Sequence, residues 1–138
     1  MSLGAQLKQI DVNVQTAEAL AIARATGEER ARLLDEQAKI VAFFDRLKLD
    51  VIEQIRNGVP SKAIRVAVGR DQYREAASLL ELYRWQGGGD LFTAKSKGWD
   101  QWCVFRDWFK AEELAVYWDY AWDGGGMESW VVLKVRPI

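Results

Sequence analysis

The chain has 138 residues, of which 49% are hydrophobic and 28% charged, a composition that excludes a disordered or fibrous protein and fits a single folded core. Its formal net charge of −1 excludes a global electrostatic attraction to nucleic acid or to anionic lipid. The sequence contains no histidine, which removes the usual general base near neutral pH and the commonest zinc ligand.

A long amphipathic helix is predicted over residues 16–56. Apolar side chains recur there at steps of three and four residues, while Glu, Asp, Lys and Arg occupy the positions between them. Thr26 and Glu29 have the spacing of a capping box beside Gly27, so we expect either a helical hairpin that breaks there or one bent helix. The apolar spacing continues upstream through a weaker helix former at residues 11–14.

A strong stop signal follows this helix. Asn57 and Gly58 are followed by Pro60. Glycine accommodates the left-handed cap of a helix, and proline cannot continue the helical hydrogen bonds. The sequence therefore divides into a helical unit over residues 1–57 and a small α+β unit over residues 58–138.

The second unit is predicted to begin with one β-α unit. Ile64, Val66 and Val68 alternate with smaller or polar residues, which favours a short strand whose branched side chains face inward. A helix over residues 61–69 is the alternative. Asp71 is a good N-cap for a helix that we expect to extend to residue 86.

Three segments rich in aromatic and branched residues follow, and a three-stranded antiparallel meander is their simplest interpretation. The strands are expected over residues 101–109, 114–122 and 129–136, with residues 91–95 as an additional edge strand. A direct turn after residue 122 would pair Trp118 with Val131. The predicted fold class is α+β, with a long N-terminal helix or helical hairpin and a three- to four-stranded antiparallel sheet.

Six of the seven tryptophans lie between residues 99 and 130. Either all of them are core residues or some form a contact surface, because tryptophan, tyrosine and arginine dominate binding hot spots. Alternation along the first aromatic strand would place Cys103 and Phe105 on one side and Trp102 and Trp108 on the other. The predicted partner-binding set is Trp102, Arg106, Trp108, Tyr117, Asp119 and Trp130.

A basic cluster gives the alternative hypothesis, which is DNA or RNA binding. Its members lie between residues 56 and 74 and are opposed there only by Asp71: Arg56, Lys62, Arg65, Arg70 and Arg74. If residues 61–69 were helical, the segment could form a helix-turn-helix that presents a recognition helix to a major groove. Arg65 would then occupy a position where such motifs bury a small residue, so the fit is imperfect.

No motif indicates catalysis or a bound metal. The glycine runs at residues 87–90 and 123–126 lack the Lys-Ser/Thr of a phosphate loop and are predicted to be turns. Asp119, Asp123 and Glu128 lack the regular spacing of a cation-binding loop. Cys103 stands in an apolar run and is expected to be buried and inert. We therefore expect no cofactor, no metal and no enzymatic activity.

The remaining features bear on location and partners. No apolar run is long enough to span a bilayer, and the first residues lack the pattern of a signal peptide, so we expect a cytoplasmic protein without membrane contact. The helix over residues 16–56 either covers the sheet of its own chain or pairs with a second copy in a homodimer. The favoured function is protein binding or inhibition through an aromatic and charged surface, and in size and composition the chain is similar to phage-encoded, viral inhibitors of host machinery.

Overall fold

The computed structural model describes residues 2–13, 16–69, 72–122 and 129–138. Its helices are α1 (Leu3–Asn13), α2 (Ala17–Arg24), α3 (Gly27–Arg56), α4 (Arg74–Leu79) and α5 (Trp99–Ala111), with 3-10 turns η1 (Ser61–Ala63) and η2 (Leu82–Arg84). Its strands are β1 (Arg65–Val68), β2 (Leu114–Trp122) and β3 (Ser129–Pro137). The predicted α+β class, with a long N-terminal helix and a three-stranded antiparallel sheet, is confirmed.

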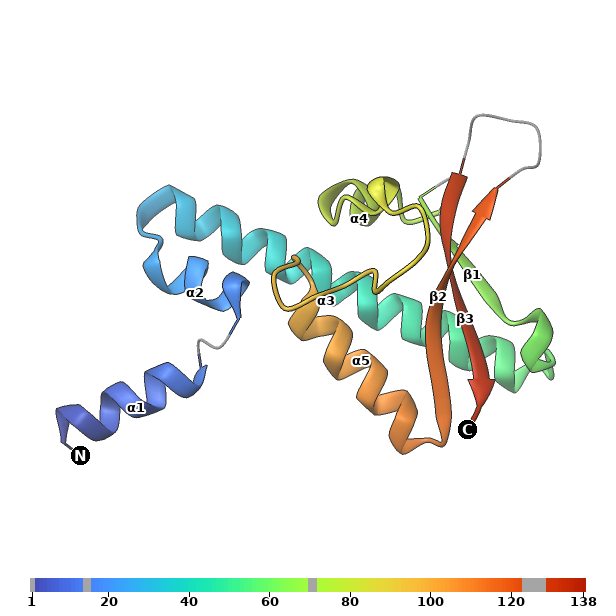
Figure 1. Cartoon of the computed structure of the whole chain (residues 1–138), viewed down its shortest axis with the longest axis horizontal. Coiled ribbons are helices and arrows are strands. Elements are labelled where there is room, and N and C mark those ends of the chain that lie inside the picture. The colour runs from blue at the N-terminus through green and yellow to red at the C-terminus, as the bar shows by residue number, and fades with distance from the viewer. Residues whose placement is uncertain (1, 14–15, 70–71, 123–128) are drawn as a thin grey trace.

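The predicted N-terminal helix is broken into α2 and α3. Thr16 caps α2, because its Oγ1 accepts a hydrogen bond from the backbone N–H of Ala19 at 3.2 Å. The chain is extended just before Gly27, where α3 begins, and Figure 1 shows α2 folded back beside the start of α3. The Thr26 side chain makes no capping hydrogen bond, so the predicted capping box is wrong although the break occurs beside it.

The apolar stripe of α3 supplies one side of the core. Its buried residues recur at steps of three and four and are Ile40, Phe43, Phe44, Leu47 and Val51. The helix ends as the sequence predicts. Gly58 has a φ of 79°, and the N–H of Val59 donates to the carbonyl of Gln54 at 3.0 Å. This is the Schellman arrangement, which needs a left-handed residue that glycine supplies without strain.

The sheet has the order β1-β3-β2, with both pairs antiparallel. Trp118 pairs with Leu133, so the predicted pairing of Trp118 with Val131 is wrong by two residues. A shift of two leaves every side chain on its predicted face, because side chains alternate between the faces of a strand. The third strand is β1, in which Val66 also pairs with Leu133.

The segment at residues 101–109 is the largest error of the prediction, because it forms most of α5 and not a strand. Trp102, Phe105 and Phe109 are buried, and these positions follow the three- and four-residue steps of a helix, whereas a strand would bury alternate residues. Residues 91–95, predicted as an edge strand, form turns and irregular structure.

The segment at residues 61–69 forms η1 followed by β1, so the predicted strand is confirmed and the alternative helix is wrong. Ile64, Val66 and Val68 are buried as expected. The helix expected over residues 71–86 is shortened to α4 and η2, because Glu81 adopts the left-handed conformation with a φ of 54°. Asp71, its predicted N-cap, lies outside the described residues.

The core lies between the helices and one face of the sheet. Val66, Val116 and Leu133 from the sheet belong to the same buried cluster as residues of α3, α4 and α5. Figure 1 shows α3 and α5 on the same side of the sheet. The opposite face contributes no residue to that cluster, so within the described part of the chain it forms a second, uncovered side of the sheet.

Candidate functional site

Trp102 is a core residue, which corrects its prediction as a contact residue. Its side chain is only 7% exposed. The ring stacks on Phe92 and Phe105, with centroids 5.8 Å and 5.7 Å apart. The assignment to the surface depended on reading residues 101–109 as a strand, and the helix turns this position inward.

The other five predicted contact residues do not form one surface. Arg106 and Trp108 belong to α5, on the helical side of the sheet. Tyr117, Asp119 and Trp130 belong to β2 and β3 and share the uncovered face, as the alternation of the strands predicts. Two separate surfaces therefore replace the single one that was predicted.

The first surface is the uncovered face of the sheet, here called the open sheet face. Its larger side chains are Arg65, Tyr117, Asp119, Trp130, Val132, Lys134 and Arg136. Three positive side chains stand against one carboxylate, which gives the face a net charge of +2. Tyr117 is 40% exposed. The face thus combines cations with aromatic rings beside the solvent.

Side chains on the open sheet face are held in place by one another. The Lys134 ammonium lies 2.7 Å from Asp119 Oδ2, and this hydrogen bond, with a second from the backbone N–H of Tyr120, holds the pKa of Asp119 below its usual range. The Arg136 guanidinium lies 5.4 Å from the centre of the Tyr117 ring. Val132 is only 1% exposed although it lies outside the core cluster, so the open sheet face also contains a buried side chain.

The four described residues of the basic cluster lie on different elements. Arg65 lies on the open sheet face, Lys62 is exposed in η1, and Arg56 lines a groove at the end of α3. Arg74 lies on α4 and lines a hollow beside α3. Arg70 lies outside the described residues. Because β1 replaces the helix that it requires, the predicted helix-turn-helix geometry is wrong.

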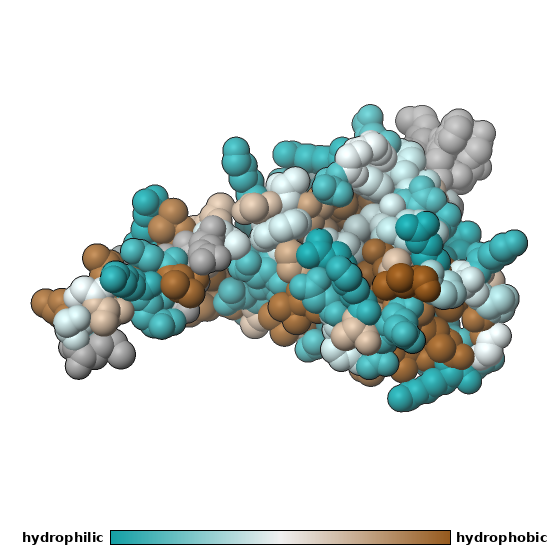
Figure 2. Space-filling view, turned by 60° about the horizontal axis from the view of Figure 1, so that its bottom comes forward, coloured by the Kyte–Doolittle hydropathy of each residue, from teal (hydrophilic) through white to brown (hydrophobic). Residues whose placement is uncertain are grey.

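The second surface is an apolar groove centred on Trp108, here called the Trp108 groove. One part, of about 280 Å³, runs between α3 and α5 and is lined by Val41, Phe44, Asp45, Lys48, Asp100, Gln101, Val104, Phe105 and Trp108. A second part, of about 680 Å³, continues past Trp108 to the ends of β2 and β3. The Lys48 ammonium lies 3.7 Å from the centre of the Trp108 ring. Figure 2 shows hydrophobic residues gathered at the lower right of its face, near the end of α5.

A third hollow, of about 600 Å³, lies between α3 and α4 and was not predicted. Inside it the Tyr73 hydroxyl donates a hydrogen bond to the Asp50 carboxylate. Burial, and then the neighbouring Asp50, raise the pKa of Tyr73 well above its usual range. A phenol with a raised pKa is a poor proton donor and acceptor at neutral pH, so this pair serves to join α4 to α3.

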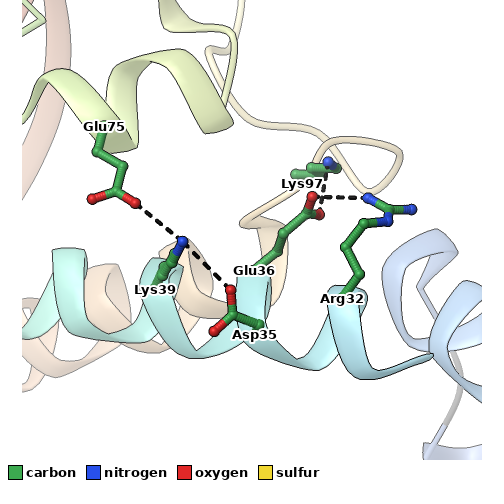
Figure 3. Close-up of polar contacts among 6 residues, drawn as sticks. All are labelled: Arg32, Asp35, Glu36, Lys39, Glu75 and Lys97. Atoms are coloured by element: carbon green, nitrogen blue, oxygen red, sulfur yellow. Dashed lines mark hydrogen bonds and ion pairs between the residues drawn. The ribbon is translucent and has the colours of Figure 1, made fainter. Parts of the chain in front are cut away.

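Two ion pairs join α3 to other segments, Lys39–Glu75 at the rim of this hollow and Glu36–Lys97 outside it, as Figure 3 shows. Lys39 of α3 lies 3.4 Å from Asp35 and 3.2 Å from Glu75 of α4. Glu36 pairs with Arg32 at 2.9 Å and with Lys97 at 3.0 Å, and the hydrogen bond from Lys97 holds its pKa below the usual range. Such exposed pairs position segments more than they stabilise the fold.

The described residues contain no group of three or more His, Cys, Asp or Glu side chains that could hold a metal ion. Asp119, considered above as a cation ligand, pairs with Lys134 instead, while Asp123 and Glu128 lie outside the described residues. Burial raises the pKa of the half-buried Cys103 thiol, which makes it a weak nucleophile near neutral pH.

These features define a small α+β protein with an open sheet face and an apolar groove centred on Trp108. Comparison with protein-family models, with curated proteins and with solved structures gave no match. Among the described helices, none is both long and apolar enough to cross a lipid bilayer.

Proposed function

We propose that this chain is a non-enzymatic binding protein that holds a protein partner on its open sheet face. The observation that supports this most is the ordering of that face before any partner arrives. Asp119 fixes Lys134, and Arg136 lies over Tyr117. Side chains that are already ordered lose little conformational entropy on binding, and aromatic and arginine side chains contribute most to binding energy.

The charges of the face indicate the chemistry of the partner. With three cations and one carboxylate, the open sheet face complements an acidic protein surface that also offers an apolar group to Tyr117 and Trp130. A partner bound there would lose access to its other ligands. Inhibition of a cellular component is therefore the role that we propose for the complex, in line with the analogy to phage-encoded inhibitors.

Single-stranded nucleic acid is the second candidate, and the same net charge with two aromatic side chains favours it. Two contacts weigh against it. Arg136 already covers the Tyr117 ring on which a base would stack, and the Asp119 carboxylate would repel phosphate. A protein partner therefore fits the face better than a nucleic acid does.

Affinity capture with variants tests both candidates. A protein that the immobilised wild-type chain captures from a nuclease-treated lysate of the source organism should be lost with Arg136→Glu. It should be retained with Lys110→Glu, which makes the same charge change at an exposed position of α5. Equal retention by both variants would remove the open sheet face as the contact surface. Tight, strongly salt-dependent binding of a labelled oligonucleotide that is lost with Arg136→Glu would favour nucleic acid instead.

A further inference from the structure

Helix α1 exposes an apolar row of side chains. Leu3, Leu7 and Ile10 are 82%, 57% and 53% exposed, and their spacing places them on one side of the helix. Figure 1 shows α1 standing apart from the rest of the molecule. An isolated helix of 11 residues is marginally stable in water, so α1 needs a surface on which to bury this row.

The Trp108 groove has the length and the chemistry to receive α1. The apolar row of α1 extends over seven helical steps from Leu3 to Ile10, about 10 Å. The walls of the groove are of similar length, from Val41 to Lys48 on α3 and from Asp100 to Trp108 on α5. An apolar helix face that lies in an apolar groove between two helices is a common mode of recognition.

The charges along the groove also match those of α1. Lys8 and Asp11 are three residues apart on the same side of the apolar row, and Asp45 and Lys48 are three residues apart on α3 with the opposite order of signs. When α1 runs parallel to α3, Lys8 meets Asp45 and Asp11 meets Lys48. Neither Lys8 nor Asp11 has an ion-pair partner elsewhere in the described part of the chain.

The course of the chain places α1 at the end of the groove. Thr16, just after α1, donates a hydrogen bond to Asp100 Oδ2 at 2.9 Å, and Asp100 lines the groove. From this anchor α1 points away from α5, as Figure 1 shows. Two copies related by a two-fold axis could therefore exchange their α1 helices, which would bury two apolar rows and two grooves at once.

We propose that α1 docks in the Trp108 groove of a second copy of this chain, in a reciprocal exchange that forms a homodimer. The open sheet face takes no part in this contact, so the inference is independent of the function proposed above. It differs from a homodimer paired along residues 16–56 because it requires α1 and the α5 wall of the groove.

Light scattering coupled to size-exclusion chromatography tests the exchange. The wild-type protein should have twice the mass of one chain. Leu7→Asp in α1 or Val104→Asp in the groove should reduce the measured mass to that of one chain. Val104 is 71% exposed, so its replacement leaves the core intact. Val12→Asp, on the opposite side of α1, and Leu49→Asp, outside the groove lining, are the matched controls and should remain dimeric.

Mixing the two variants adds a test that is specific for exchange. Leu7→Asp keeps an intact groove and Val104→Asp keeps an intact α1, so an equimolar mixture should form a heterodimer through one remaining contact. A wild-type protein that has the mass of one chain at every concentration would overturn the proposal, whether α1 stays exposed or folds onto its own groove. A dimer that survives both substitutions, or a mixture that stays at single mass, would overturn it as well.

Discussion

The indole rings of Trp102 and Trp118 lie 5.5 Å apart between centroids and join α5 to β2 inside the core. Trp118 is half-buried on the helical face of the sheet, and Phe92 contacts both rings. Aromatic clusters of this kind contribute large buried areas and additional ring–ring energy. Among the described tryptophans, Trp85 and Trp99 also pack in or against the core, whereas Trp108 is 37% exposed.

Replacement of Trp102 by alanine should destabilise the fold by about 3–5 kcal/mol, because it removes a large buried ring and leaves a cavity. Leu49→Ala, at a position of α3 that is 64% exposed and lies outside the Trp108 groove, should change the free energy of unfolding by less than about 0.5 kcal/mol. Urea unfolding followed by circular dichroism measures both. Similar, small effects at the two positions would mean that Trp102 is not a core residue.

Gly98 should not tolerate a side chain. Its φ is 82°, and a Cβ there would lie 2.9 Å from Leu80 Cδ2 and 3.2 Å from Phe92 Cε1. We expect Gly98→Ala to cost about 2–4 kcal/mol through backbone strain and overpacking. Gly88 has a similar φ of 77° and open space around it, so Gly88→Ala reports the backbone strain alone, at about 1–2 kcal/mol. Equal melting temperatures for the two variants would contradict the packing around Gly98.

Tyr73→Phe should destabilise the fold by about 1–3 kcal/mol, because it leaves the half-buried Asp50 carboxylate without the hydroxyl that donates to it. Tyr83 is well exposed, so Tyr83→Phe provides the matched control and should leave the free energy of unfolding unchanged. Chemical denaturation of the two variants makes the comparison. No difference between them would show that the contact between α3 and α4 adds nothing to stability.

Stability should depend on the ionisation of Glu18. Burial, as the largest cause, raises the pKa of this carboxyl above its ordinary value of 4.5, although the backbone N–H of Gly98 donates to it. A carboxyl whose folded-state pKa is raised contributes fully below the unfolded-state pKa, and its contribution is lost as the pH rises through the folded value. The wild-type chain should therefore lose stability relative to Glu18→Gln as the pH rises from about 4 to about 7.

Urea titrations of both proteins across that pH range measure this difference. Glutamine can still accept the hydrogen bond from Gly98, so the variant differs mainly in the ionisable group. Parallel stability curves, or a wild-type chain that gains on the variant as the pH rises, would show that Glu18 is not destabilised by burial.

The spacing of apolar residues and the residues at turns allowed several elements to be predicted from the local sequence alone. The stripe of α3, the Gly58 cap and the alternation in β1 each have a direct local cause. The faces of β2 and β3 were predicted with the wrong pairing, because Trp122 pairs with Ser129 and not two residues earlier, yet a shift of two residues keeps each face.

Helix α5 was missed because its amino-acid composition is typical of a strand, whereas the spacing of its buried residues is that of a helix. Trp102, Phe105 and Phe109 have helical spacing, but aromatic and branched residues on every side suggested a strand. The faces of this segment were therefore assigned wrongly, and Trp102 was placed on the surface. The open sheet face could be foreseen at Tyr117, Asp119 and Trp130, whereas its open side depends on where the helices pack, which no local pattern reveals.

Isothermal titration calorimetry with the captured protein partner tests the role of the open sheet face most directly. Arg136→Glu should weaken the affinity by about tenfold or more, because it removes the cation over Tyr117 and introduces a carboxylate opposite an acidic partner. Lys110→Glu should bind like the wild-type chain. Equal affinities for all three proteins would contradict the assignment of partner binding to this face.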